Sequence, residues 1–163
     1  MSDAPAPSAP RLVLMCGPAG SGKSTHAHRL VAQGYVRCSI DDLAWAVGYR
    51  EHPLPDDVHE QLAAQLREQV AAMLRQGRDV VLDNAFATRA ARDEYRRLGA
   101  EHGAVVEVVF VSTPRGVALA RVAARTGAHR HDVVLAPEVA AGYYDGFEVP
   151  TPQEGPLSVV SGG

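Results

Sequence analysis

An eight-residue motif, GPAGSGKS at residues 17–24, constrains the fold of this chain more than any other feature. It fits the pattern G-x-x-x-x-G-K-[ST] at every fixed position. Glycines let the backbone curl so that successive N–H groups point at an anion, and a helix that starts there adds its positive N-terminal end. The apolar run from Arg11 to Cys16, which predicts a buried strand, comes directly before the motif. A strand, this loop and a helix in that order predict a site for the phosphates of a nucleotide.

The side chains of the motif predict how the phosphates are held. Lys23 can reach the β- and γ-phosphates as a compact point charge, Ser24 offers a hydroxyl to Mg²⁺, and Thr25 is placed to contact phosphate beside it. Lys23 is the single lysine among 16 basic residues, and the planar fork of an arginine does not replace an ammonium in a tight anion site. The nucleotide-binding residues predicted here are Gly17, Pro18, Ala19, Gly20, Ser21, Gly22, Lys23, Ser24 and Thr25.

The rest of the chain alternates between helical and strand patterns. Further strands are predicted near residues 35–40, 79–83, 104–111 and 156–160, and helices near 22–33, 41–47, 56–76, 88–102, 114–125 and 137–145. In this interpretation Thr88 caps one helix and Pro114 lies in the first turn of another. The alternation predicts a three-layer α/β fold with a parallel sheet, in which ligands bind at the carboxyl ends of the strands.

Composition limits the class of protein and its surroundings. The net charge of −3 and the pI of about 6.1 argue against a wide basic surface for duplex nucleic acid. Cys16 and Cys38 are predicted to be buried free thiols. The chain has no apolar stretch of membrane-spanning length and no signal-peptide pattern, so a cytoplasmic location without a membrane contact is predicted. The proline-rich residues 1–10 are expected to form a disordered arm, and residues 11–163 a single domain.

Two acidic strand ends are candidates for the chemistry. Asp83 closes the apolar run Val80–Leu82, where a carboxylate can hold Mg²⁺ together with Ser24; a simple turn-forming aspartate is the alternative. Asp41 and Asp42 lie at the end of the strand predicted near residues 35–40, where a carboxylate can accept the proton of an attacking hydroxyl. We assign Asp41 as the base and Asp42 as the helix cap, with the order of the two left open.

An arginine cluster follows the fourth strand. Arg121 and Arg125 share one face at the end of a helix, and Arg130 lies in the loop beyond Gly127. Such a segment can act as a short lid that folds over a nucleotide and places positive charge on the transferring phosphoryl group. The alternative is that these cations only complement the helix dipole.

The remaining conspicuous side chains have ordinary interpretations. Arg92, Arg96 and Arg97 are expected on solvated helix faces. Trp45 and Tyr49 are expected to pack in the core, although they could also wall an acceptor pocket. His129 and His131 have no third partner at a metal-ligand spacing, so a zinc site is not expected.

Taken in order, the segments GPAGSGKST, SIDD, VVLDN and RVAARTG resemble the small P-loop kinases. That family includes the polynucleotide 5′-hydroxyl kinase domain, zeta-toxin-like kinases and chloramphenicol phosphotransferase, and the resemblance covers nearly all of residues 11–150. It implies a P-loop NTPase fold with five parallel strands in the order 2-3-1-4-5 and a short lid that carries arginines. It also implies ATP and Mg²⁺ as cofactors, Lys23, Asp41 and Arg125 as catalytic residues, and Arg121 near the adenine.

One position departs from the polynucleotide kinases. They carry an arginine three residues after the base, and Ala44 stands there in this chain. The predicted function is therefore an ATP- and Mg²⁺-dependent kinase that acts on a hydroxyl group of a small molecule. The alternatives are a polynucleotide 5′-hydroxyl kinase, with an acceptor channel lined by Arg50 or Arg89, and a non-catalytic ATP-binding regulatory module.

Overall fold

The computed structural model describes residues 8–51, 53–127 and 134–162. The strands in these residues are β1 (Arg11–Cys16), β2 (Val36–Cys38), β3 (Val80–Asp83), β4 (Val105–Ser112) and β5 (Leu157–Ser161). The helices are α1 (Lys23–Ala32), α2 (Ile40–Ala46), α3 (Asp56–Arg75), α4 (Arg89–Glu101), α5 (Arg115–Ala123) and α6 (Pro137–Asp145), with one turn of 3₁₀ helix at Pro152–Glu154. None of the described helices combines the length and the apolar character needed to cross a membrane.

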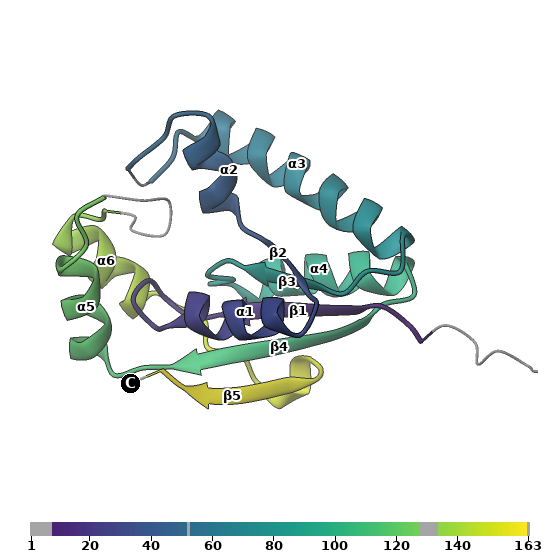
Figure 1. The fold of residues 1–163 in the computed structure, drawn as a ribbon. Coiled ribbons are helices and arrows are strands. Elements are labelled where there is room, and N and C mark those ends of the chain that lie inside the picture. The colour runs from purple at the N-terminus through teal and green to yellow at the C-terminus, as the bar shows by residue number, and fades with distance from the viewer. Residues whose placement is uncertain (1–7, 52, 128–133, 163) are drawn as a thin grey trace, which may run out of the picture.

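All five strands are parallel and lie in the order β2-β3-β1-β4-β5 (Figure 1). β1 lies at the centre, where Leu14 is paired with Leu82 of β3 on one side and Val108 of β4 on the other. The predicted fold and strand order are confirmed. Because the strands run in the same direction, their carboxyl ends meet at one edge of the sheet, on the left in Figure 1.

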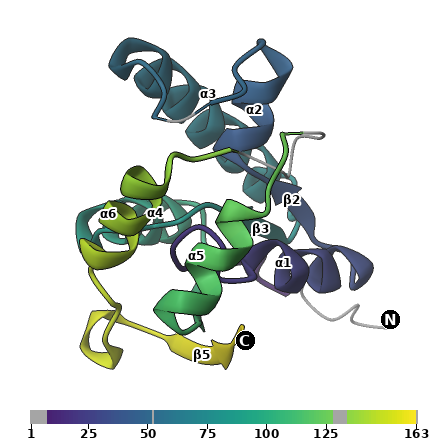
Figure 2. The ribbon, with the colours of Figure 1, turned by 90° about the vertical axis from the view of Figure 1, so that its left-hand side faces the viewer.

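Both faces of the sheet are covered, because successive side chains of a strand point to opposite sides. Leu12, Leu14 and Cys16 of β1 join a core with apolar residues of α3 and α4. Val13 and Met15 join a second core against α1. The helices α5 and α6 lie together near the carboxyl ends of the strands, and α2 and α3 lie together above the sheet in Figures 1 and 2. Cys16 and Cys38 are buried free thiols, as predicted.

Helix starts follow the predicted capping chemistry at one site and differ at two others. Thr88 caps α4, with its hydroxyl oxygen accepting a hydrogen bond from the N–H of Ala91 at 3.1 Å. The assignment of Asp42 as the cap of α2 is wrong, because Ser39 accepts from the N–H groups of Asp41 and Asp42 at 3.1 and 3.4 Å. Pro114 is the N-cap of α5 rather than a residue of its first turn.

The expectation that the arginines of α4 face solvent is wrong for Arg92. Its side chain is fully buried, and its Nε and Nη2 atoms donate to the carboxylate of Glu154 at 3.1 and 2.8 Å. Its Nη1 atom donates to the carbonyl of Phe86 at 2.7 Å. Arg96 also reaches Glu154, at 3.2 Å, whereas Arg97 is exposed as expected. Glu154 is 62 residues away from Arg92 in the sequence, so no local pattern predicts this pair.

Replacing Arg92 by Met is expected to lower the free energy of unfolding by about 3 kcal/mol, because the change leaves a buried carboxylate short of its partner. The loss stays near that value because Arg96 still reaches Glu154. Urea unfolding followed by circular dichroism measures it. The double variant Arg92→Met/Glu154→Met is the matched control and is expected to regain part of the loss. A single variant as stable as the wild type would contradict this account.

The Arg92–Glu154 pair also makes the stability of the fold depend on pH in the acidic range. The hydrogen bond from Arg92 holds the pKa of the Glu154 carboxyl below its ordinary value of 4.5. The folded state therefore binds fewer protons than the unfolded state in that range, and the contribution of the pair is present above pH 4.5. It is lost as the pH falls through the lowered pKa of Glu154, and the double variant lacks this loss.

Candidate active site

The turn between β1 and α1 has the backbone conformation that an anion-binding loop requires. Gly20 and Gly22 have φ angles of +82° and +100°, in the left-handed region that favours glycine. A Cβ atom at Gly20 would also collide with the carbonyl of Ala118 on α5. Gly22 is the N-cap of α1 and contributes no side-chain cap, so the first-turn N–H groups of this helix are available to a bound anion.

Neighbouring elements hold this loop in place. The Thr113 hydroxyl donates to the carbonyl of Ser21 at 2.7 Å, and the N–H of Gly17 donates to the carbonyl of Ala85 at 3.0 Å. Arg121 of α5 donates from Nη1 to the carbonyl of Gly20 at 3.2 Å. Arg121 thus supports the backbone of the loop and does not line the pocket described next. Its contact with adenine stays a prediction.

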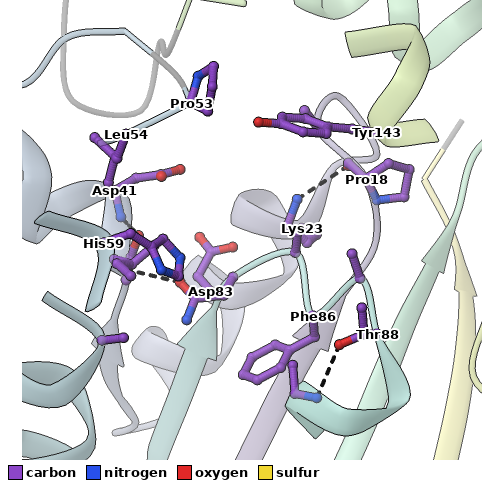
Figure 3. Close-up of a pocket in the computed structure, with 18 of the residues that line it drawn as sticks. Pro18, Lys23, Asp41, Pro53, Leu54, His59, Asp83, Phe86, Thr88 and Tyr143 are labelled. Atoms are coloured by element: carbon purple, nitrogen blue, oxygen red, sulfur yellow. Dashed lines mark hydrogen bonds between the residues drawn. The ribbon is translucent and has the colours of Figure 1, made fainter. Parts of the chain in front are cut away.

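A cavity of about 750 Å³ opens at the carboxyl ends of the strands. Figure 3 shows Lys23, Asp41 and Asp83 directed into the same space, with Tyr143 of α6 above and Phe86 below. The predicted site residues that line the cavity are Pro18, Ala19, Lys23, Ser24, Asp41, Asp83 and Arg125. The other predicted loop residues, Gly17, Gly20, Ser21, Gly22 and Thr25, form the turn and the start of α1 beside it. Arg130 lies outside the described residues.

Lys23 lies at the electrostatic centre of this pocket. Burial lowers the pKa of its ammonium group, and the carboxylates of Asp83 and Asp41 act in the opposite direction, while Arg125 lowers the pKa further. The Nζ atom donates to the carbonyl of Pro18 at 3.3 Å. The ammonium group therefore interacts electrostatically with Asp83, Asp41 and Arg125. A negatively charged ligand here would offset the cost of burying this charge.

Arg37 of β2 is a residue of the site that sequence reasoning missed. Its Nη2 and Nε atoms donate to Oδ2 of Asp83 at 2.7 and 2.9 Å, and its Nη1 atom donates to Oδ2 of Asp42 at 2.7 Å. Nearby, the side-chain oxygen of Asn84 accepts from the N–H of Ile40 at 3.0 Å. These contacts join the two acidic strand ends into one unit. The available signal was a basic residue inside a short apolar strand.

The oxygen donors at the base of the pocket fit a magnesium ion. The hydroxyl of Ser24 and the carboxylate of Asp83 line the same cavity. Among residues 8–51, 53–127 and 134–162, no group of three or more His, Cys, Asp or Glu side chains could enclose a metal by itself. Magnesium is commonly held by one or two protein oxygens, with substrate phosphates and water completing its shell. A sparse oxygen set beside a phosphate loop is therefore suited to Mg²⁺.

The aromatic residues singled out from the sequence do not form the wall of this cavity. The guanidinium of Arg50 lies 3.6 Å from the centre of the Trp45 ring, and Tyr49 packs on a small apolar cluster with Leu54 and Leu62. Core packing is thus the better description of Tyr49. Arg89 pairs with Asp93 at 3.4 Å on the surface of α4. Neither Arg50 nor Arg89 is among the described residues that line the cavity.

Solved structures share this architecture at low sequence identity. A sugar kinase from Janibacter sp. HTCC2649 aligns with a TM-score of 0.67 at 23% identity, over 93% of this chain and 85% of its own. Kti12 of Chaetomium thermophilum, solved with ADP-AlF3, aligns with a TM-score of 0.67 at 19% identity, over 92% and 88%. A chain of the Pnkp1/Rnl/Hen1 complex aligns with a TM-score of 0.64 at 21% identity over 69% of this chain, which spans only 38% of that longer chain. At these identities the likeness shows the fold.

Sequence comparison gives a more direct relationship. No curated protein matches the chain. The family model described as an AAA domain (AAA_33) matches residues 12–150, which contain the phosphate loop, both acidic strand ends and α5. The chain therefore belongs to this AAA domain family and has the fold of the small P-loop kinases.

Proposed function

We propose that this protein is an ATP- and Mg²⁺-dependent kinase that transfers the γ-phosphoryl group to a hydroxyl of a small molecule. The observation that carries the proposal is the meeting of Lys23, Asp41 and Asp83 in one cavity at the carboxyl ends of the strands (Figure 3). These residues come from α1, α2 and β3, and the charges of both carboxylates raise the pKa of Lys23. A phosphate site, a carboxylate suited to a base and a carboxylate suited to a metal are thus within reach of one substrate.

In this proposal the acceptor hydroxyl approaches from the side of Asp41. Its oxygen attacks the γ-phosphorus, the bond between that phosphorus and the β–γ bridging oxygen breaks, and ADP leaves. The proton of the hydroxyl passes to the carboxylate of Asp41. Lys23 and Arg125 stabilise the charge that develops on the transferring group. Mg²⁺, held by Ser24 and Asp83, would neutralise phosphate charge and orient the phosphates.

The comparisons support a kinase that uses nucleotide but leave the acceptor open. The sugar kinase has the same fold as this chain and covers nearly all of it, and Kti12 was solved with ADP-AlF3. The likeness to a chain of the Pnkp1/Rnl/Hen1 complex favours a second candidate, a polynucleotide 5′-hydroxyl kinase. Polynucleotide kinases of this type carry an arginine that binds the phosphate of the acceptor, and Ala44 stands at that position in this chain. This difference argues against the second candidate. A non-catalytic ATP-binding module is the third alternative.

A transfer screen separates these three functions. The full chain is incubated with γ-labelled ATP and Mg²⁺ in the presence of small alcohols, sugars, nucleosides, hydroxylated antibiotics and 5′-hydroxyl oligonucleotides. We expect label to pass to a small molecule and not to the oligonucleotides. Label on the oligonucleotides alone would identify a polynucleotide kinase. Tight nucleotide binding without transfer to any acceptor would identify a binding module.

A further inference from the structure

The cavity extends from the phosphate loop into the space between α3 and α4. On the α3 side it is lined by His59, Ala63, Leu66 and Arg67, and on the α4 side by Phe86, Ala87, Ala91, Glu94 and Tyr95. We call this region the α3–α4 chamber. Alanines on both sides line it, and their small side chains leave room between the two helices. Figure 3 shows His59 and Phe86 on opposite sides of the space in front of Asp83.

The charges around the α3–α4 chamber disfavour an anionic acceptor. Arg67 is already paired with Glu94, with 3.1 Å between Nη1 and Oε1. Asp41 and Asp56 also line the cavity. Of the cations in its lining, Arg67 and Arg37 are paired with carboxylates, and Lys23 and Arg125 belong to the proposed phosphate site. A phosphate or carboxylate on the acceptor would have to approach these carboxylates or break an existing pair. Because Arg67 and Glu94 are both partly exposed, breaking their pair costs little. The discrimination against anions therefore comes mainly from repulsion by the carboxylates.

The floor of the chamber is apolar and firmly held. Phe86 and Tyr95 are 6% and 7% exposed, and their rings meet edge to face with centroids 5.5 Å apart. Phe86 has a φ of +50°, the single described non-glycine residue with a positive φ. The Nη1 atom of Arg92 holds the carbonyl of Phe86 in this conformation at 2.7 Å. An aromatic residue held in a strained backbone conformation beside a binding site is typical of a preformed contact surface.

We propose that the acceptor is an uncharged or cationic alcohol with an apolar body, which lies in the α3–α4 chamber against Phe86 while its hydroxyl reaches Asp41. This inference rests on the kinase function proposed above and names the chemical class of its substrate. It excludes sugar phosphates, sugar acids and nucleotide ends as preferred acceptors. It also excludes small polyols, which have no apolar body to cover Phe86, Ala87 and Ala91.

The test compares acceptors that differ in one property. Each compound that accepts label from ATP is paired with a derivative that carries an added carboxylate or phosphate away from the reacting hydroxyl, and with one that lacks the apolar group. We expect both derivatives to have kcat/KM about tenfold lower or worse, the range that one lost apolar contact already reaches. Transfer that favours anionic or wholly hydrophilic acceptors would overturn the assigned substrate class and leave the kinase function standing.

Variants of α4 then locate the acceptor. Ala91→Leu fills the chamber and is expected to lower kcat/KM for the acceptor about tenfold or more while the KM for ATP is unchanged. Ala90→Leu, on the exposed face of the same helix, is the matched control and is expected to behave as the wild type. Glu94→Gln releases Arg67 and is expected to improve the anionic derivative relative to its uncharged parent. Melting temperatures show that each variant is folded.

The outcomes separate this inference from the function on which it rests. Nucleotide binding without transfer to any acceptor class would overturn both. Transfer that is equally insensitive to Ala91→Leu and to Ala90→Leu would overturn the location in the α3–α4 chamber. Transfer to an uncharged apolar alcohol that is impaired by Ala91→Leu would support the location of the acceptor in the α3–α4 chamber. Improved transfer to the anionic derivative in Glu94→Gln would support the proposed discrimination by charge.

Discussion

Asp41→Asn is expected to lower kcat for phosphoryl transfer by about 10²- to 10⁴-fold, the usual contribution of a positioned general base. Asparagine keeps the size of the side chain and cannot take the proton of the acceptor hydroxyl. Asp41 lies in the first turn of α2, across the cavity from the phosphate loop, so nucleotide affinity is expected to change little. Single-turnover transfer from labelled ATP measures the first effect, and calorimetric titration with a non-hydrolysable ATP analogue measures the second.

Asp42→Asn is the matched control for this prediction. Asp42 is the next residue of the same helix turn, but its carboxylate is bound by Arg37 at 2.7 Å. We therefore expect a smaller loss of transfer from Asp42→Asn than from Asp41→Asn. A larger loss in the Asp42 variant would reverse the assignment that the sequence left open. Full transfer activity in the Asp41 variant would remove Asp41 from the mechanism.

Lys23→Met is expected to lower transfer by about 10²- to 10³-fold, the usual effect of removing one contact to developing negative charge. It should also abolish most of the increase in melting temperature that ATP and Mg²⁺ produce in the wild type. Lys23→Arg is expected to fail as well, because a broad planar guanidinium does not replace a compact ammonium in a tight anion site. An active Lys23→Arg variant would contradict the close fit that we assign to the loop.

The Lys23→Met substitution is expected to leave stability unchanged or to raise it. Burial is the main cause of the lowered pKa of Lys23, so the charged group opposes folding when no ligand is bound. Between this lowered pKa and the ordinary value of 10.5, the folded wild type binds fewer protons than the unfolded chain, and its stability rises with pH. The advantage of Lys23→Met should therefore shrink as the pH rises toward 10.5. Urea unfolding of both proteins at several pH values measures this difference.

Local patterns predicted most of the fold and the conformation of the phosphate loop. The phosphate loop, the apolar runs and the glycines that end helices each determine a short segment through backbone preference and burial, so the sequence predicted them well. The carboxyl ends of parallel strands share one edge of the sheet, which is why the sequence alone could place Asp41 and Asp83 near Lys23. The capping error at α2 arose because Ser39 and two aspartates compete for the same N–H groups within four residues.

The contacts that sequence reasoning missed join residues far apart in the chain. Arg92 was expected in solvent and is buried against Glu154, and Arg37 was passed over although it binds both Asp42 and Asp83. Arg92 has a surface-like local sequence, whereas Arg37 lies inside a short apolar strand. The partner of each is supplied by another element, and only chain folding decides that a carboxylate lies there to offset the cost of burying the guanidinium.

The glycine-rich turn between a strand and a helix predicted a phosphate loop on a parallel α/β sheet, because the conformation of such a turn is set by its own residues. The tertiary structure decided which side chains share the cavity with Lys23, and that α3 and α4 enclose an apolar chamber beside it. The shape and charge of that chamber depend on how helices far apart in sequence pack against one another. No local spacing encodes that packing.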